Sequence, residues 1–319
     1  MSAALGPLAE ALPPRLREPR NAGPLVAALA LAAGAFGWAA ASGSRLPEFP
    51  RRESEFVVPE RRDASLRALE DHLKDSPDDL RSLVQAGVLR FQRGSDDYPE
   101  AINLLEEARK LGAADPRLFY YLGVMYQAEG LYPFATQEYR RFLRNRPDDR
   151  EVRLLLAKLL FLDSKAEEAL GHYEALRRAA KRADPIVDEN AALCLLTLKR
   201  SAEAALLLES LLARGGETAR RARLRLGLAA LEGLRWSEAR EHLLAVLPLD
   251  GRPDLGVLPA TVHAGLAAAH EKLGELDGAK ASWEEAARLD SKDAKIRSSL
   301  RAATAALKKR DRESKKKTK

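Results

Sequence analysis

The chain has 319 residues, of which 46% are hydrophobic and 6% aromatic, and it carries a formal net charge of +6. The surplus comes entirely from residues 308–319, where eight Lys or Arg residues outnumber Asp311 and Glu313, so the remainder is formally neutral. The overall charge therefore gives no support for nucleic-acid binding by the body of the chain, and the lone Cys194 excludes an intramolecular disulfide.

The first long apolar stretch predicts a membrane segment. No charged residue lies between Arg20 and Arg45, and the Ala- and Leu-rich residues 24–44 are about long enough to cross a bilayer. We expect a transmembrane helix or signal anchor at 24–44, preceded by an amino-terminal tail at 1–23. Two alternatives stay open: a secretory signal cleaved near Ala41, and a helix that does not insert or another targeting sequence.

The charges around this segment leave its orientation open. Three arginines precede it and three follow it: Arg15, Arg17, Arg20, Arg45, Arg51 and Arg52. Because positively charged flanks normally stay in the cytoplasm, this even distribution favours neither direction strongly. The arrangement of a signal anchor, with the amino terminus inside, is our first choice and would place the rest of the chain across the membrane.

Residues 45–62 are predicted to form an extended linker. Pro47, Pro50 and Pro59 interrupt the segment, and its apolar residues follow no helical period. Such a linker would hold the following domain away from the bilayer.

Small residues then recur at nearly constant spacing through most of the chain. One series steps by 34, 35, 35 and 40 residues and consists of Gly123, Ala157, Ala192, Gly227 and Ala267. A second series has identical steps and consists of Ala135, Ala169, Ala204, Ala239 and Ala279. A period near 34 residues with paired small residues predicts a stack of helix–turn–helix units, each packed only against its neighbours.

The clearest unit lies between Pro116 and Pro147. Its first helix is predicted from a helical face made of Phe119, Leu122, Gly123 and Tyr126, and its second from Tyr132, Ala135, Tyr139 and Phe142. Gly130 separates the two helices, since glycine adopts the left-handed conformation without steric cost. This order of large, small and aromatic residues resembles a tetratricopeptide repeat (TPR).

The resemblance extends over residues 63–309. Five units match in register, a looser unit lies between Leu83 and Ala108, and Leu66 to Leu73 suggests a lone helix before it. Residues 294–307 read as a closing helix. We therefore expect an all-α fold: a TPR-type α-solenoid of about six helix–turn–helix repeats with a carboxyl-terminal capping helix, preceded by a single transmembrane helix and followed by a basic disordered tail at 310–319.

The resemblance also implies where a partner binds, because the first helix of each TPR unit lines the concave side. The corresponding groove residues are Tyr120, Val124, Gln127, Leu154, Lys158, Phe161, Glu189, Leu193, Leu196, Leu224, Leu228 and Leu231. A groove this apolar favours an amphipathic helix or an extended apolar peptide, held by surface burial. The alternative is that these residues are buried against one another in a tightly wound stack.

No pattern in the sequence indicates catalysis, a cofactor or a metal. Of the five histidines only His263 and His270 share a unit, none has a partner at metal-ligand spacing, and core packing or a hydrogen bond is the expected role of that pair. No phosphate-binding glycine loop or nucleophile motif occurs. Glutamate pairs such as Glu106–Glu107 are expected on outer helix faces. Cys194 lies among leucines, as an inert core thiol does.

The combination resembles bacterial single-span repeat proteins that serve cell-envelope machines. We expect a membrane-anchored scaffold or adaptor in a translocon, secretion or motility complex, attached to the inner membrane with the repeats in the periplasm or, alternatively, in the cytoplasm. A second hypothesis is a periplasmic holdase that binds apolar peptide segments. A third is an adaptor for acidic ligands through the basic tail, which has no aromatic residues for base stacking. The oligomeric state stays open.

Overall fold

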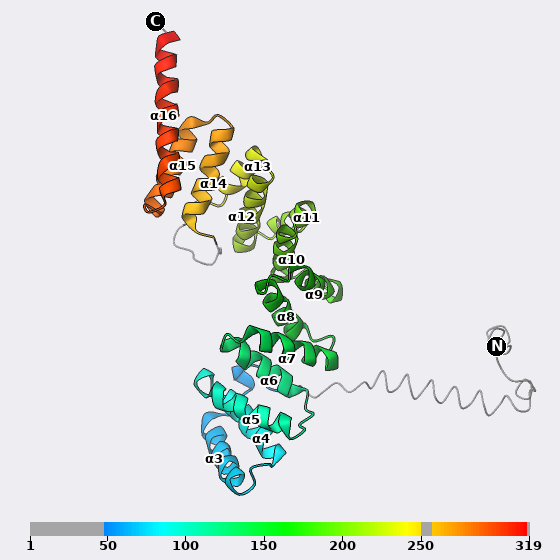
Figure 1. The fold of residues 1–319 in the computed structure, drawn as a ribbon. Helices are drawn as coiled ribbons and strands as arrows, with labels where there is room; N and C mark the ends of the chain where they lie inside the picture. The colour runs from blue at the N-terminus through cyan, green and yellow to red at the C-terminus, as the bar shows by residue number, and fades with distance from the viewer. Residues whose placement is uncertain (1–47, 250–256, 318–319) are drawn as a thin grey trace, which may run out of the picture. The chain divides into compact units, whose positions relative to one another are not determined.

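The computed structural model of the chain describes residues 48–249 and 257–317 (Figure 1). Within these ranges, fourteen α-helices, α3 to α16, and two short 3-10 helices follow one another without a strand. The predicted tail at 1–23 and transmembrane segment at 24–44 lie outside the described residues. None of the helices in the described ranges combines the length and the apolar character needed to cross a bilayer.

The chain divides into two compact units, residues 1–63 and 64–319. In the described part of the first unit, the guanidinium of Arg51 lies 4.5 Å from the ring centre of Phe49, and a 3-10 helix, η2, covers Glu53–Glu55. Helix α3 (Pro59–Asp75) then begins at a proline, whose fixed φ suits a first helical turn. The predicted linker at 45–62 is therefore not extended throughout: it contains η2 and the first turn of α3.

The second unit contains the six predicted hairpins. We number them repeats 1 to 6: α4 (Leu80–Phe91) with α5 (Tyr98–Lys110), α6 (Arg117–Ala128) with α7 (Tyr132–Asn145), α8 (Arg150–Leu162) with α9 (Ala166–Ala179), α10 (Pro185–Thr197) with α11 (Ser201–Leu212), α12 (Gly216–Glu232) with α13 (Trp236–Leu244), and α14 (Pro259–Lys272) with α15 (Leu276–Leu289). Each second helix packs against the first helix of the next repeat, so the hairpins stack in sequence order as predicted.

Close approach of the two helices in a hairpin explains the small residues at constant spacing. A Cβ atom added to Gly123 would lie 2.5 Å from the ring of Tyr139, and one added to Gly227 would lie 2.7 Å from Leu243. These distances are far below van der Waals contact, so the second helix packs directly on the glycine backbone. The sequence interpretation of this series is confirmed.

The turn between the two helices has the same backbone in five of the repeats. One residue adopts a positive φ, and the next residue donates its backbone N–H to the carbonyl five positions back, a bond of 2.8–2.9 Å. The residues with positive φ are Gly130, Ser164, Lys199, Leu234 and Gly274. Three repeats therefore carry a side chain where glycine is preferred, and the stack imposes the conformation on them.

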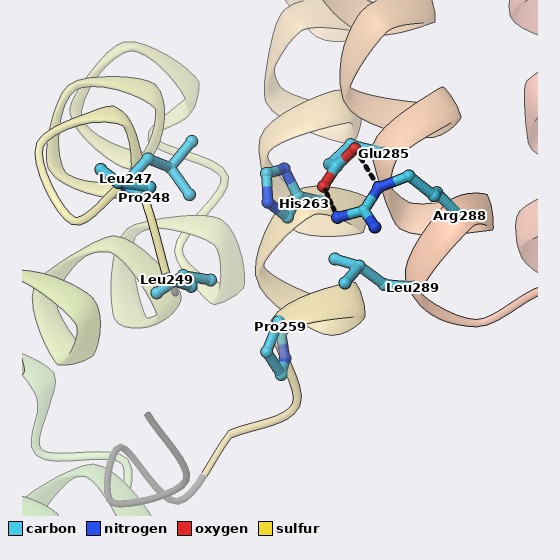
Figure 2. Close-up of a pocket in the computed structure, with 8 residues that line it drawn as sticks. All are labelled: Leu247, Pro248, Leu249, Pro259, His263, Glu285, Arg288 and Leu289. Carbon is cyan, nitrogen blue, oxygen red and sulfur yellow. Dashed lines mark hydrogen bonds and ion pairs between the residues drawn. The ribbon is translucent and has the colours of Figure 1, made fainter. Parts of the chain in front are cut away.

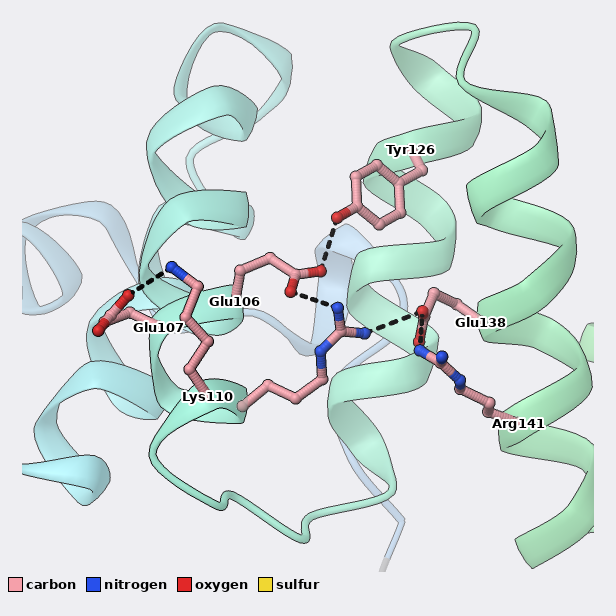
Figure 3. A network of polar contacts seen from close by, with 7 residues as sticks. Glu106, Glu107, Lys110, Tyr126, Glu138 and Arg141 are labelled. Carbon is pink, nitrogen blue, oxygen red and sulfur yellow. Dashed lines mark hydrogen bonds and ion pairs between the residues drawn. The ribbon is translucent and has the colours of Figure 1, made fainter.

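A polar network joins repeats 1 and 2 (Figure 3). The hydroxyl of Tyr126 on α6 donates to Glu106 Oε1 of α5 at 2.6 Å, and Arg109 of α5 donates to Glu106 and, at 3.0 Å, to Glu138 Oε1 of α7. Arg141 donates to the same oxygen of Glu138 at 2.5 Å. The prediction that Glu106 lies on an outer helix face is wrong, because Glu106 points toward the next repeat.

The stack ends with helix α16 (Ala294–Lys317), which packs on α15. Ile296 and Ala303 of α16 share a buried cluster with Trp283 and Ala286 of α15. The capping helix was predicted to end at 307, but it continues for ten residues through Lys317. Residues 310–317, predicted as part of a disordered tail, are therefore helical, and 318–319 lie outside the described residues.

Candidate protein-binding surface

The predicted groove residues do not form one continuous open surface. Tyr120 and Leu224 are buried, with exposed fractions of 3% and 1%. Lys158 is exposed. The other nine residues are partly exposed: Val124, Gln127, Leu154, Phe161, Glu189, Leu193, Leu196, Leu228 and Leu231. The structure thus separates the set into core residues and residues that a partner can reach.

Tyr120 is held in the core between repeats 2 and 3. Its ring packs edge-on against Tyr121 at 5.6 Å and lies 6.0 Å from the ring of Phe142. Its hydroxyl donates to Glu151 Oε1, at the start of α8, at 3.0 Å. A buried phenol needs such an acceptor, so this hydrogen bond of Tyr120 helps to hold α6 against α8. Because Tyr120 is buried, a partner cannot reach it in this structure.

The three leucines predicted on α12 belong to the packing between repeats 5 and 6. Leu224 is a member of a buried cluster, and Leu228 and Leu231 pack against it. The other buried members are Leu243, Val246, Leu249, Val262 and Leu266. Leu231 packs closely on Gly265 of α14, which has no side chain: a Cβ atom added to Gly265 would lie 2.5 Å from the Leu231 side chain. Leu224 is therefore a core residue, and Leu228 and Leu231 are partly exposed residues that pack against the same cluster.

Five partly exposed apolar residues of the predicted groove, and the exposed Lys158, lie on α6, α8 and α10. We call this set the central face: Val124, Leu154, Lys158, Phe161, Leu193 and Leu196. It combines partly exposed aliphatic and aromatic side chains with one exposed lysine. A surface of this composition gains free energy by burying apolar area and can pair its single cation with an acidic group.

Polar pairs between successive first helices flank the central face. Glu151 of α8 accepts the hydroxyl hydrogen bond of Tyr120, and Arg221 of α12 donates to Glu189 Oε2 of α10 at 2.9 Å. Gln127 accepts a hydrogen bond from the Tyr139 hydroxyl at 2.9 Å and so contributes to its own hairpin. Sequence reasoning missed Glu151 and Arg221. The sequence spacing could have indicated both residues, because the partners in these two pairs are 31 and 32 residues apart, close to the repeat period.

Two pockets of about 380 Å³ each lie away from the central face. One is lined by the start of α4 and by the segment before α6: Leu80, Arg81, Val84, Gln85, Ala113, Ala114, Asp115 and Arg117. The other lies at the junction of repeats 5 and 6 (Figure 2) and is lined by Leu247, Pro248, Leu249, Pro259, His263, Glu285, Arg288 and Leu289.

The second pocket offers little polar chemistry. Glu285 accepts hydrogen bonds from the guanidinium of Arg288 at 2.5 and 2.9 Å, so the two charges satisfy each other. Burial lowers the pKa of His263, which favours the neutral imidazole, with the nearby Arg288 acting in the same direction. The pocket is therefore mostly apolar around one closed ion pair (Figure 2).

Several large apolar side chains at the hairpin turns are exposed and were not predicted as a surface. Leu131, Tyr132 and Phe134 cluster at the turn between α6 and α7, where the rings of Tyr126 and Phe134 lie 5.5 Å apart. Leu162 and Leu234 are exposed at the turns of repeats 3 and 5. Nothing in the repeat pattern distinguishes these positions from the buried leucines beside them.

The described residues contain no cluster of His, Cys, Asp and Glu that could hold a metal ion. Cys194 is fully buried, which confirms the predicted core position, and burial raises the pKa of its thiol to about 11. His270 makes a hydrogen bond within repeat 6, with its Nδ1 2.6 Å from Glu275 Oε2.

Comparison with known proteins supports the fold and goes no further. No family model and no curated protein sequence matches the chain significantly. Among solved structures, the C-terminal part of a TPR repeat-containing protein from Cytophaga hutchinsonii is similar with a TM-score of 0.57 and 14% identity, covering 75% of this chain and 95% of that chain. The type IV pilus biogenesis factor PilW is similar with a TM-score of 0.50 and 15% identity, covering 69% of this chain and 98% of that one.

These similarities establish that residues 64–317 adopt a TPR-type, all-α solenoid fold in the part that the structure describes. At 14% and 15% identity they carry no information on what the chain binds.

Proposed function

We propose that the chain is a scaffold that binds an amphipathic or extended apolar protein segment on its central face. TPR-type stacks expose long helical surfaces without enclosing a reaction site, which suits protein binding. The observation that carries the proposal is that five apolar residues on the first helices of repeats 2 to 4 stay partly exposed together with exposed Lys158: Val124, Leu154, Phe161, Leu193 and Leu196. An enzymatic role draws no support from the clusters of titratable groups described above.

The proposal extends to the location of the scaffold. We infer that residues 24–44 anchor the chain in a bacterial inner membrane with the repeats in the periplasm, and the alternative places the repeats in the cytoplasm. The scaffold would serve the assembly of a cell-envelope complex, such as a translocon, secretion or motility machine. PilW, which shares the fold, is a type IV pilus biogenesis factor.

Binding at the central face is tested by the double substitution L154E/L193E in the full chain. Glutamates there would oppose burial of an apolar partner while leaving the hydrogen bonds of Tyr120 and Glu189 in place. The matched control is L206E, since Leu206 is an exposed leucine on the second helix of repeat 4. Partner proteins that crosslink to the wild-type chain in gently solubilised membranes should also crosslink to L206E but not to L154E/L193E. The circular dichroism spectra of all three chains should be the same.

Retention of every crosslinked protein by L154E/L193E would refute the central face as the binding surface. Weak binding of a whole panel of unfolded apolar peptides, each lost in the same variant, would instead favour the holdase alternative over a dedicated scaffold.

The membrane arrangement has its own test. Carbonate extraction of membranes should leave the full chain in the pellet and release a variant lacking residues 24–44. Protease added to intact spheroplasts should digest the repeats if they are periplasmic, and protection of the repeats would select the cytoplasmic alternative.

A further inference from the structure

The rotation of helix α16 about its own axis determines which side chains of its carboxyl-terminal part face away from the stack. Ile296 and Ala303 are buried against α15, and seven residues after Ala303 the guanidinium of Arg310 lies 2.6 Å from Asp277 at the start of α15. Residues seven apart share a helical face, so these three contacts define the side of α16 that faces the stack. Arg310 also engages Asp311, at 2.9 Å.

Five cations lie on the opposite side of the same helix. At about 100° per residue, Lys308, Lys309, Arg312, Lys315 and Lys316 fall within an arc of roughly 120° centred opposite Arg310. We call them the basic stripe. The two carboxylates of this segment lie outside the arc, Asp311 paired with Arg310 and Glu313 on the other flank.

The members of the basic stripe are exposed, and in the described part of the chain none of them makes an ion pair. This distinguishes them from many other surface cations of the stack, which have carboxylate partners: Arg140 pairs with Glu168, Lys199 with Glu232, and Lys280 with Glu284. The stripe spans about 12 Å of helix at 1.5 Å per residue. It therefore presents a dense, uncompensated positive charge on the side of α16 that faces away from the Arg310–Asp277 contact with α15.

The chemistry of the stripe selects one kind of partner. Residues 308–319 include no apolar or aromatic side chain, so this segment offers nothing to insert into hydrocarbon or to stack on bases. Four of the five cations are lysines, whose ammonium groups act as point charges on flexible side chains. They lack the planar guanidinium group with which arginine binds a phosphate through two hydrogen bonds. Clusters of four to eight such residues on a helix suit a surface of anionic lipid headgroups.

We infer that the basic stripe is a second membrane contact, which adsorbs α16 onto anionic phospholipid by electrostatic attraction. This contact is independent of the central face and of residues 24–44. A polybasic patch by itself binds a membrane reversibly, so the stripe would position α16 on the lipid and would not anchor the chain. Docked in this way, α16 would hold the last repeat of the stack against the lipid.

The test uses the full chain and sedimentation with large unilamellar vesicles. Vesicles of pure phosphatidylcholine measure any contribution of the remaining chain, and vesicles with 30% phosphatidylglycerol add the anionic surface. The variant K308Q/K309Q/R312Q/K315Q/K316Q removes the stripe and keeps the helix-forming length. The matched control R67Q/R144Q/K181Q/R182Q/K292Q removes the same charge from five exposed cations elsewhere.

We expect the stripe variant to lose roughly a few thousandfold in partitioning onto anionic vesicles, about fivefold per cation, while the control changes less than tenfold. Raising the salt from 50 to 500 mM should weaken wild type to the level of the stripe variant, and neither should change on phosphatidylcholine.

Equal partitioning of wild type and the stripe variant onto anionic vesicles would overturn the inference, and so would an equal loss in the control variant. Stronger binding of a 20-base-pair DNA duplex, or of poly-glutamate, at matched charge and salt would overturn it in favour of a nucleic acid or an acidic protein.

Discussion

Tyr126 of repeat 2 donates its hydroxyl proton to Glu106 of repeat 1 across 2.6 Å (Figure 3). The phenol is buried and the carboxylate is partly buried, and burial together with this bond to Glu106 raises the pKa of Tyr126. Since neighbouring repeats stabilise a stack mainly through their shared interface, this bond and the arginines beside it contribute directly to the coupling of repeats 1 and 2.

Replacing Tyr126 with Phe should destabilise the stack by about 1–2 kcal/mol, because a hydrogen bond to a partly buried charge is lost. Tyr132→Phe is the control, since the Tyr132 side chain is exposed at the adjacent turn, and its effect should stay within about 0.5 kcal/mol. Urea unfolding followed by circular dichroism measures both. Equal midpoints for the two variants would show that the Tyr126–Glu106 bond contributes nothing to stability.

Glu138 gives this interface a distinctive pH dependence. Its side chain is only 3% exposed, and its Oε2 is buried without a hydrogen-bond partner among the described residues. Burial raises its pKa above the usual 4.5, against the opposing effect of Arg141 and Arg109. The folded state therefore holds the proton more tightly than the unfolded state, so the contribution of Glu138 to stability is full below 4.5 and is lost as the pH rises through the raised pKa.

The variant Glu138→Gln isolates that contribution. Many other carboxylates lose favourable partners in acid, so the measured quantity is the difference in unfolding free energy between wild type and Glu138→Gln. As the pH falls from 7 toward 4.5, this difference should move in favour of wild type. A difference that stays constant with pH, or moves the other way, would contradict the raised pKa.

Leu234 should be replaceable by Gly with a gain in stability. Its φ of 56° at the turn of repeat 5 lies in the left-handed region, and its side chain is 66% exposed, so little packing would be lost. We expect about 1 kcal/mol of stabilisation from relief of the backbone strain. Leu206, which is 69% exposed inside helix α11, provides the matched control, because Leu206→Gly should cost about 1 kcal/mol. Melting temperatures that shift in the same direction for both would argue against strain at Leu234.

Two glycine-to-alanine substitutions should likewise change the stability of the fold in opposite directions. Gly123→Ala places a methyl group 2.5 Å from the Tyr139 ring and should destabilise by about 2 kcal/mol, since the hairpin must open. Gly171, in helix α9, has no atom within 4 Å of an added Cβ, so Gly171→Ala should stabilise by up to about 1 kcal/mol through helix propensity. Thermal unfolding compares the two, and a stable Gly123→Ala protein would mean that Tyr139 can move away freely.

The recurring elements were predictable because their cause is local or repeats along the chain. Gly123 and Ala135 mark one hairpin, and the same pair of positions marks four more, so the period alone located the helices and their order. The left-handed residue of each turn follows from the same period: Ser164, Lys199 and Leu234 align with Gly130 although none of them is a glycine. The start of α3 at Pro59 and the length of α16 were missed, because neither belongs to a repeat.

The sequence by itself thus determined the helical hairpins, their stacking order and the core position of Cys194, since spacing and side-chain size dictate them. Only the tertiary structure decided that Tyr120 and Leu224 are core residues, that Glu106 faces Tyr126, and that Arg310 and the basic stripe lie on opposite sides of one helix. The physical reason is that a first-helix residue has the same local pattern whether the next repeat covers it or leaves it open. Its exposure depends on the side chains of a neighbour more than 30 residues away, such as Glu151 for Tyr120.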